Sequence, residues 1–428
     1  MLDMVGVGPF ITIPLMISAM GGPQSLLGWV LGATIASCDG LVWSELGAAM
    51  PDSGGSYEYL QQGFGPDSLG RLMGFLFLWQ VMLAAPLTAA SGAVGFADYA
   101  RFLFPRLSNA GHTGLAMVVC VVATILLYRD IRSIGRISIV LWIGLIAGMG
   151  IIIWSGFSHF HPALAFSLPP GAFRWSPAFL AGLGSATLIS MYDFSGYFNV
   201  CLIGGEVKNP ARTIPRTVLL SIGILALLYL AMNLSIIGVL PWREAMQSHS
   251  IMSDFMQHLY GTAAASWMTG LILVIAFASV FCVLLGYTRV PFAAAVEGRF
   301  FSAFARVHPT RHFPSFSVVY LGLLSAVACL LGLEALIKAL LVIQIVTQFA
   351  AQCIAVVVIR RSRPDIRLPF RMPLFPLPAI VALAGWIFIL VTSGWVYVLS
   401  GFALVALGIA AYVLRARRGC DWPWRPAA

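Results

Sequence analysis

The sequence has few charged residues and no long polar segment. Of its 428 residues, 60% are hydrophobic and only 10% are charged, and the mean hydropathy is +0.91. Because an average soluble domain carries about 25% charged residues, this composition excludes a water-soluble globular protein. No polar connection is long enough to form a separate soluble domain, so we expect one membrane domain over residues 1–428.

Histidine and cysteine are sparse, and their positions exclude several chemistries. All seven histidines fall in polar loops, which leaves the membrane region without a histidine proton relay or a haem or copper ligand set. The seven cysteines show no Cys-x-x-Cys spacing, and six of them lie in apolar runs as small hydrophobic side chains. We therefore predict no metal site and no cofactor.

Apolar runs long enough to cross a bilayer recur along the whole chain. A helix needs roughly 20 residues to span about 30 Å of hydrocarbon. We expect an all-α integral membrane protein with about twelve transmembrane helices, and no cleaved signal peptide, because the first run contains two prolines and follows no basic segment. The expected spans are 3–20, 25–48, 71–97, 113–128, 133–157, 177–205, 213–240, 263–288, 315–333, 336–359, 373–393 and 396–414.

The basic residues predict the orientation, because Lys and Arg accumulate in short cytoplasmic loops. With both termini in the cytoplasm, 20 of the 25 basic residues lie on the cytoplasmic side. The five on the other side are Arg101, Arg106, Arg174, Arg243 and Lys338. The net charge of +9 thus reflects topology and anionic lipid, not a nucleic-acid partner. We expect a multi-pass protein of the cell membrane.

Two of the apolar spans are interrupted by small and turn-forming residues. The interruptions are Gly-Val-Gly-Pro-Phe at 6–10 and Tyr-Asp-Phe-Ser-Gly-Tyr at 192–197. Lipid offers no hydrogen-bond partner, so unwound backbone at membrane depth must be buried in protein or line a cavity. Paired interruptions of this kind indicate the substrate site of a transporter.

Each interruption has a functional and a structural interpretation. At Gly6 and Gly8, backbone N–H groups and the positive end of the following half-helix favour an anion such as a carboxylate; close packing of small residues is the alternative. Asp193 could pair with a substrate ammonium group, or it could cap the helix where it restarts. These two roles can coexist.

Aromatic side chains lie at both interruptions. Phe10, Tyr192, Tyr197 and Phe198 could form a lid over a substrate, or they could pack within the helix bundle.

Ionisable and amide side chains inside the spans are candidates for coupling or for helix contacts. Asp39, midway along the second span, could carry a coupling proton or bond a neighbouring helix. Gln344, Gln348 and Gln352 lie on one face of a helix at i, i+4 and i+8. They could line a polar path or join helices by hydrogen bonds.

Two glutamates lie nearer the cytoplasmic ends of their spans. Glu45 and Glu206 are expected to pair with Lys208, Arg212 or Arg289. We predict a structural or gating ion network for them.

Several stretches resemble the amino acid-polyamine-organocation transporter superfamily. They are Gly-Val-Gly-Pro-Phe-Ile-Thr-Ile-Pro at 6–14, Glu-Leu-Gly through Pro-Asp-Ser-Gly-Gly-Ser-Tyr at 45–57, and Gly-Glu-Val-Lys-Asn-Pro with the following Arg and Pro-Arg at 205–216. Their order and spacing also match, and 287–299 looks like the end of the superfamily's eighth helix. The resemblance covers nearly the whole chain. Within the superfamily the chain is similar to the polyamine-transporting branch, a likeness that rests on fewer residues.

The resemblance implies a leucine-transporter-like fold that works by alternating access. Two inverted five-helix repeats would occupy 1–157 and 158–359, followed by two further helices and a basic tail in 360–428.

It also implies roles for particular residues. Gly6, Val7 and Gly8 would receive the substrate α-carboxylate, and Tyr192, Asp193 and Ser195 would surround the amine or side chain. The predicted substrate-binding set is Gly6, Val7, Gly8, Phe10, Tyr192, Asp193, Ser195 and Tyr197.

The chain departs from the superfamily in two ways. A half-helix of about ten residues normally precedes the Gly-x-Gly, whereas five residues, which span only about 7.5 Å as helix, precede it here. We expect a true start upstream of Met1; the other interpretation is an incomplete inner gate. The fifth span also lacks the Lys that some proton-coupled relatives carry.

The leading prediction is a secondary active transporter of amino acids or polyamines. We expect proton-coupled symport or exchange, with sodium left open as the coupling ion. A membrane enzyme would need a convergent nucleophile, acid/base or metal set, and none is visible. The alternative is a transport-inactive, sensor-like homologue or an N-terminally truncated gene product.

Overall fold

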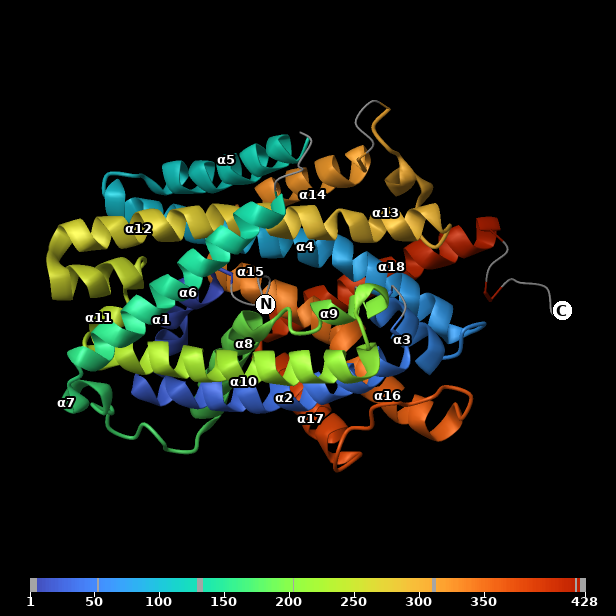
Figure 1. The fold of residues 1–428 in the computed structure, drawn as a ribbon, viewed down its shortest axis with the longest axis horizontal. Helices are drawn as coiled ribbons and strands as arrows, with labels where there is room; N and C mark the ends of the chain where they lie inside the picture. Colours follow the sequence, from blue (N-terminus) through green and yellow to red (C-terminus); the bar gives the residue numbers. More distant parts are fainter. Residues whose placement is uncertain are drawn as a thin grey trace.

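The computed structural model shows an all-helical chain (Figure 1). The expected beginning of the first span, at 3–5, lies outside the described residues. The structure describes residues 6–51, 54–128, 134–202, 204–309, 313–419 and 422–423. No strand occurs in these ranges, which confirms the predicted all-α fold class.

The helices follow one another along the chain with short connections. In order they are α1 (Gly8–Met20), the 3₁₀ turn η1 (Pro23–Ser25), α2 (Leu26–Ala49), α3 (Ser56–Gly63), α4 (Leu69–Leu103), α5 (Asn109–Leu127), α6 (Ile134–Ser158), α7 (Pro162–Ala165), α8 (Pro177–Phe194), α9 (Asn199–Leu202), η2 (Gly204–Glu206), α10 (Pro210–Ile237), α11 (Trp242–Ala245), α12 (Ile251–Tyr287), α13 (Arg289–Val296), η3 (Ser302–Ala305), α14 (Ser315–Ala328), α15 (Leu333–Gln344), the π-helical turn η4 (Ile345–Phe349), α16 (Ala350–Ser362), α17 (Leu377–Thr392) and α18 (Trp395–Gly419).

The expected membrane spans coincide with these helices. Seven helical stretches of the described chain are long and apolar enough to cross a membrane, and four shorter apolar helices accompany them. Each expected span overlaps one of these eleven stretches, except for 177–205, which contains α8 and α9. The connection 241–262 contains α11 and the part of α12 that precedes a bend at Gly261, and the connection 289–314 contains α13 and η3.

Corresponding helices of the two predicted five-helix units pack against each other. These pairs are α1 with α8, α2 with α10, α4 with α12, and α5 with α14. In Figure 1 the long helices α2, α4, α10 and α12 run along the longest axis of the molecule. Such pairing is what two interlocked repeats require, while the boundaries at 157 and 359 remain a prediction.

Local sequence signals fix the limits of α1 and α8, which carry the interruptions. Pro9 occupies the first turn of α1, where its missing N–H is not needed. The helix ends at Gly21, whose φ of 67° permits the left-handed conformation of a C-cap. Ser176 caps α8, since its hydroxyl accepts a hydrogen bond from the Phe179 N–H at 3.1 Å.

Small residues bring α8 close to α2. A Cβ added at Gly28 would lie only 2.7 Å from the Cβ of Ala186, and one at Gly32 would clash with Ser190. Ser190 donates a hydrogen bond to the Gly28 carbonyl at 2.9 Å. Because close backbone approach and interhelical hydrogen bonds stabilise helix pairs in lipid, this contact holds α8 in place beside α1.

Candidate functional site

The two interruptions predicted from the sequence lie side by side. Helix α1 starts at Gly8 after a bend at Gly6, and it packs against α8, which ends at Phe194. After α8 the chain unwinds for four residues before α9, with Gly196 at a φ of 103°. Residues far apart in the sequence therefore meet where both helices are open.

Asp193 is the charged residue at this junction. Its side chain is buried, and the Thr12 hydroxyl of α1 donates a hydrogen bond of 2.6 Å to its Oδ2. Its Oδ1 is buried with no hydrogen-bond partner among the described residues. Tyr229 donates to the backbone carbonyl of Asp193 at 3.3 Å. One carboxylate oxygen is thus held by Thr12, and the other is buried and unpaired.

The structure corrects one interpretation of Asp193. The residue lies in the last turn of α8 and not at a helix start, so it does not cap its own helix. A carboxylate at a helix C-terminus gains nothing from the helix dipole. Instead, the Asp193 carboxylate lies against Gly8, the first residue of α1. A Cβ added at Gly8 would be 2.5 Å from Asp193 Oδ1. The absence of a side chain at Gly8 makes room for the carboxylate.

Both interruptions open onto one cavity of about 850 Å³. Of the predicted substrate-binding residues, six line it: Gly6, Val7, Gly8, Tyr192, Asp193 and Ser195. Other walls come from α4, α6, α12, α13 and α15, including Gly92, Trp142, Ser279, Arg289, Leu340 and Gln344. The cavity therefore combines an apolar lining with a few polar groups, as ligand sites do.

Phe10 and Tyr197 do not line this cavity, which is a correction to the predicted set. The Phe10 side chain is 1% exposed in the core, and its carbonyl accepts a 2.7 Å hydrogen bond from the Tyr99 hydroxyl. The Tyr197 hydroxyl points to Asp39. Of the proposed aromatic lid, only Tyr192 and Phe198 reach the cavity, because the other two rings fill space between helices.

Asp39 is a fully buried acceptor that joins three other parts of the chain. Its carboxylate receives hydrogen bonds from Tyr197 at 2.5 Å, from the Trp386 indole at 3.1 Å and from the Cys353 thiol at 3.6 Å. Asp39 does not line the cavity. These contacts correspond to the second of its two interpretations, hydrogen bonding to neighbouring helices.

Glu45 forms an ion pair, but with a partner other than those expected. Arg360 of α16 donates two hydrogen bonds to its carboxylate, at 2.8 and 2.9 Å, and the Met372 N–H donates a third at 2.7 Å. The Arg360 guanidinium also stacks on Phe375, 4.1 Å from the ring centroid. Glu45 is completely buried, so this pair fastens α2 to α16 and to the segment before α17.

The remaining gating candidates do not join that pair. Glu206 and Lys208 are exposed, and within the described ranges neither forms an ion pair with Arg212 or Arg289. Arg289 begins α13 and lines the cavity. The predicted residues therefore do not form one network. Glu45 pairs with Arg360, Arg289 lines the cavity, and Glu206 and Lys208 are exposed.

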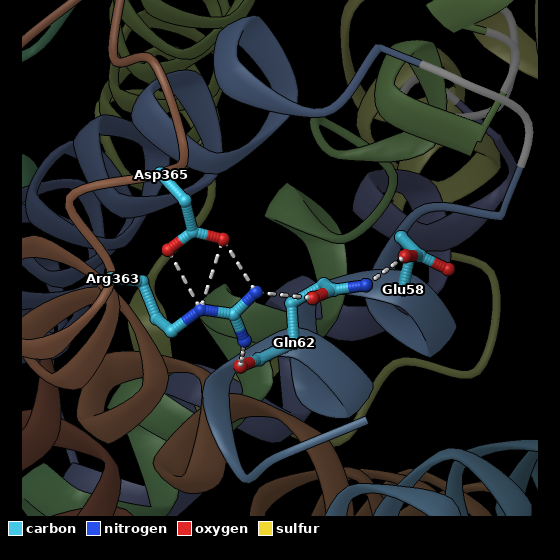
Figure 2. Close-up of polar contacts among 4 residues, drawn as sticks. All are labelled: Glu58, Gln62, Arg363 and Asp365. Carbon is cyan, nitrogen blue, oxygen red and sulfur yellow. Dashed lines mark hydrogen bonds and ion pairs between the residues drawn. The ribbon is translucent and has the colours of Figure 1, made fainter. Parts of the chain in front are cut away.

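A second polar cluster, which involves α3 and the loop after α16, was not predicted from the sequence. Figure 2 shows Arg363 between Gln62 and Asp365, with Gln62 bonded in turn to Glu58. The guanidinium of Arg363 donates at 3.2 Å to the Gln62 side chain and at 2.8 Å to Asp365, which lowers the pKa of that carboxyl. The cluster ties α3 to the loop after α16, and no local pattern marks that pairing.

The glutamine stripe is split by the π-helical turn η4. Gln348 accepts a hydrogen bond from Gln80 at 3.1 Å and donates to Ser56 at 3.0 Å, and Ser56 donates to Gln352 at 2.8 Å. These two glutamines therefore join helices. Gln344, which precedes η4, lines the cavity instead.

The fold and the cavity define a multi-pass membrane transporter with discontinuous helices around a central site. The amino acid permease family model matches residues 1–414. The chain is 24% identical to the branched-chain amino acid permease BcaP of Bacillus subtilis, over 97% of this chain and 92% of that one. It is 25% identical to the serine/threonine exchanger SteT of the same organism, over 90% and 86%. A methylthioribose transporter of B. subtilis is 23% identical over 97% and 90%.

The chain belongs to the amino acid permease family. It is a membrane transport protein and not an enzyme. The predicted resemblance to the amino acid-polyamine-organocation superfamily is thereby confirmed.

The contact between Gly8 and Asp193 predicts unequal effects of the same substitution at neighbouring glycines. Gly8→Ala places a methyl group against Asp193 Oδ1 and should lower the free energy of unfolding by roughly 1–3 kcal/mol. Gly6→Ala meets Ser279, with Oγ at 3.5 Å and Cβ at 3.9 Å, which is ordinary contact, and should change the free energy of unfolding by less than about 0.5 kcal/mol. Denaturant titration in mixed micelles measures both. Equal effects would show that Asp193 does not lie where we describe it.

The Glu45–Arg360 pair predicts a recoverable loss of stability. Arg360→Met leaves the Glu45 carboxylate buried without its charge partner and should destabilise the protein by roughly 3 kcal/mol. Adding Glu45→Gln removes the unpaired charge and should restore most of that loss. The double-mutant cycle is measured by the same titration, and strict additivity would contradict the pairing.

Proposed function

We propose that this protein is a secondary active transporter that binds an α-amino acid between α1 and α8 and moves it by alternating access. The observation that carries the proposal is Asp193 Oδ1, a buried acceptor without a partner among the described residues, beside the first residue of α1. The substrate ammonium group would bind Asp193. Its carboxylate would bind the N–H groups from Gly6 to Gly8 at the positive end of α1.

The juxtaposition of the two groups favours a zwitterion. An α-amino acid carries its carboxylate and its ammonium group on one carbon, so its two charged ends need a donor site and an acceptor site in close proximity. Gly8 and Asp193 provide that proximity. A polyamine, the second candidate from the sequence, would use Asp193 alone and leave the α1 terminus without an anion.

The relatives support an amino acid as the substrate class. BcaP is named for branched-chain amino acids and SteT for serine and threonine. The methylthioribose transporter shows that a chain of similar identity can carry a different solute. The uptake experiment therefore includes a polyamine as a competitor.

For coupling we propose a proton, with Asp193 as the group that exchanges it. The three acids buried in the described spans differ in what surrounds them. Asp39 accepts three hydrogen bonds and Glu45 is paired with Arg360, and neither residue lines the cavity. Asp193 lines the cavity, and its Oδ1 has no hydrogen-bond partner among the described residues. For orientation we propose cytoplasmic termini in the cell membrane, on the distribution of Lys and Arg.

The experiment is uptake into proteoliposomes with labelled amino acids, with and without an inward proton gradient, a sodium gradient and competing putrescine. The proposal would be supported if gradient-driven uptake is inhibited by unlabelled amino acids and not by putrescine. Competition by putrescine alone would make the polyamine the substrate, and uptake driven only by sodium would refute proton coupling. No uptake or counterflow of any probe would favour a sensor-like protein.

Neutralising Asp193 should abolish uptake while the protein still inserts and folds. Asp193→Asn keeps the shape of the side chain but removes the charge that binds the ammonium group. Asp98→Asn is the matched control, since Asp98 pairs with His112 at 2.8 Å outside the cavity. Initial uptake rates, normalised to protein incorporated, compare the two. Wild-type uptake by Asp193→Asn would leave this residue a structural role only.

Thr12 should act as a positioning residue for Asp193. Thr12→Val removes the 2.6 Å hydrogen bond and should raise the KM for uptake by roughly tenfold or more, since hydrogen bonds to charged groups contribute about 1.5–3 kcal/mol. Thr12→Ser should restore the KM. Thr187→Val, which removes a hydroxyl bonded within α8, serves as the control. An unchanged KM in Thr12→Val would disprove the positioning role.

A further inference from the structure

Gln344 is a second residue of the cavity lining with an unpaired buried acceptor. The residue is 6% exposed, it lines the cavity, and its Oε1 is buried without a hydrogen-bond partner in the described part of the chain. A buried amide oxygen that stays unpaired loses its interaction with water and gains nothing in return. A ligand group that donates a hydrogen bond to this oxygen therefore gains an interaction that an apolar group at the same place lacks.

The π-helical turn explains why this glutamine alone faces the ligand space. Gln348 and Gln352 are occupied by Gln80 and Ser56. A π turn contains more than the 3.6 residues of an α turn, and Gln348 lies inside Ile345–Phe349 while Gln352 follows it, so the i, i+4, i+8 spacing no longer places the three glutamines on one face. Gln344 lines the cavity, whereas the other two bond to residues of α3 and α4.

Gln344 and Asp193 line the same cavity from two helices, α15 and α8, that contact each other. Tyr192, the neighbour of Asp193, packs against a buried cluster that includes Leu340 and Ile343 of α15. The Tyr192 hydroxyl is itself engaged by Ser91 at 2.7 Å. Beside the proposed ammonium site, Gln344 therefore offers the rest of the substrate a polar side chain with an unpaired amide oxygen.

We infer that Gln344 determines side-chain specificity and that the substrate is an amino acid whose side chain ends in a hydrogen-bond donor, a hydroxyl or an amine. This inference rests on the proposed function, since it requires an amino acid anchored at Asp193. A site that hydrogen-bonds a substrate group rejects the analogue lacking it, because the protein's own polar atom is then left unpaired. An aliphatic side chain of equal size therefore binds more weakly.

Binding to the purified protein in detergent tests this independently of transport. The probes are two isosteric pairs, homoserine with norvaline and ornithine with norleucine, which exchange a terminal hydroxyl or ammonium group for a methyl group. We expect the donor-bearing member of at least one pair to bind roughly tenfold or more tightly, as read from isothermal titration and from the rise in melting temperature. The pair that shows the preference distinguishes a neutral donor from a cationic one.

Gln344→Met should abolish this preference by weakening only the donor-bearing ligand. Gln348→Met is the matched control, because it makes the same exchange one turn away, outside the cavity lining; it should keep the preference even if it lowers stability. Equal binding within both wild-type pairs, or a preference retained in Gln344→Met, would overturn the inference. If no probe binds at all, the inference is likewise overturned, and the uptake assay decides separately whether the proposed function survives.

Discussion

Unwound backbone cannot face lipid, and this constraint governs the structure around the centre of the bundle. The open ends of α1 and α8 solve the problem together, since they pack against each other and against a shared cavity. The hydrogen bond from Thr12 to Asp193 joins the two helices across 181 positions of sequence. Small residues between α2 and α8 allow the approach that makes this contact possible.

The three acids buried in the described spans, Asp39, Glu45 and Asp193, differ in the hydrogen-bond donors that surround their carboxylates. The Asp39 carboxylate accepts three hydrogen bonds. The Glu45 carboxylate pairs with an arginine and accepts a hydrogen bond from a backbone N–H, so both acids connect helices. The Asp193 carboxylate has a single donor, and its second oxygen is unpaired among the described residues. A buried charge that is incompletely paired is unfavourable unless a ligand completes it. This difference in partners, and not the presence of an acid in a span, distinguishes the ligand site from the structural positions.

Several features of the site could be predicted because they are local in the chain. Gly6, Gly8 and Asp193 are recognisable from residue type beside an apolar run, and all three line the cavity. Phe10 and Tyr197 were assigned to the same site on the same argument, yet they face the core. The chain pattern shows that a helix is interrupted, but it does not show in which direction each side chain leaves the unwound backbone.

By itself the sequence determined the all-helical membrane fold, the spans and the two interruptions, because hydrophobic length and turn-forming residues act over short distances. Only the tertiary structure decided the partners. Arg360 belongs to Glu45 and Thr12 to Asp193, although each pair is separated by more than a hundred residues. Likewise, Gln348 in the π turn that follows Gln344 bonds to Gln80 of α4 and Ser56 of α3, which lie far away in the sequence. Such contacts depend on how helices distant in the sequence pack against each other. Residue type and local spacing do not predict which of these helices become neighbours.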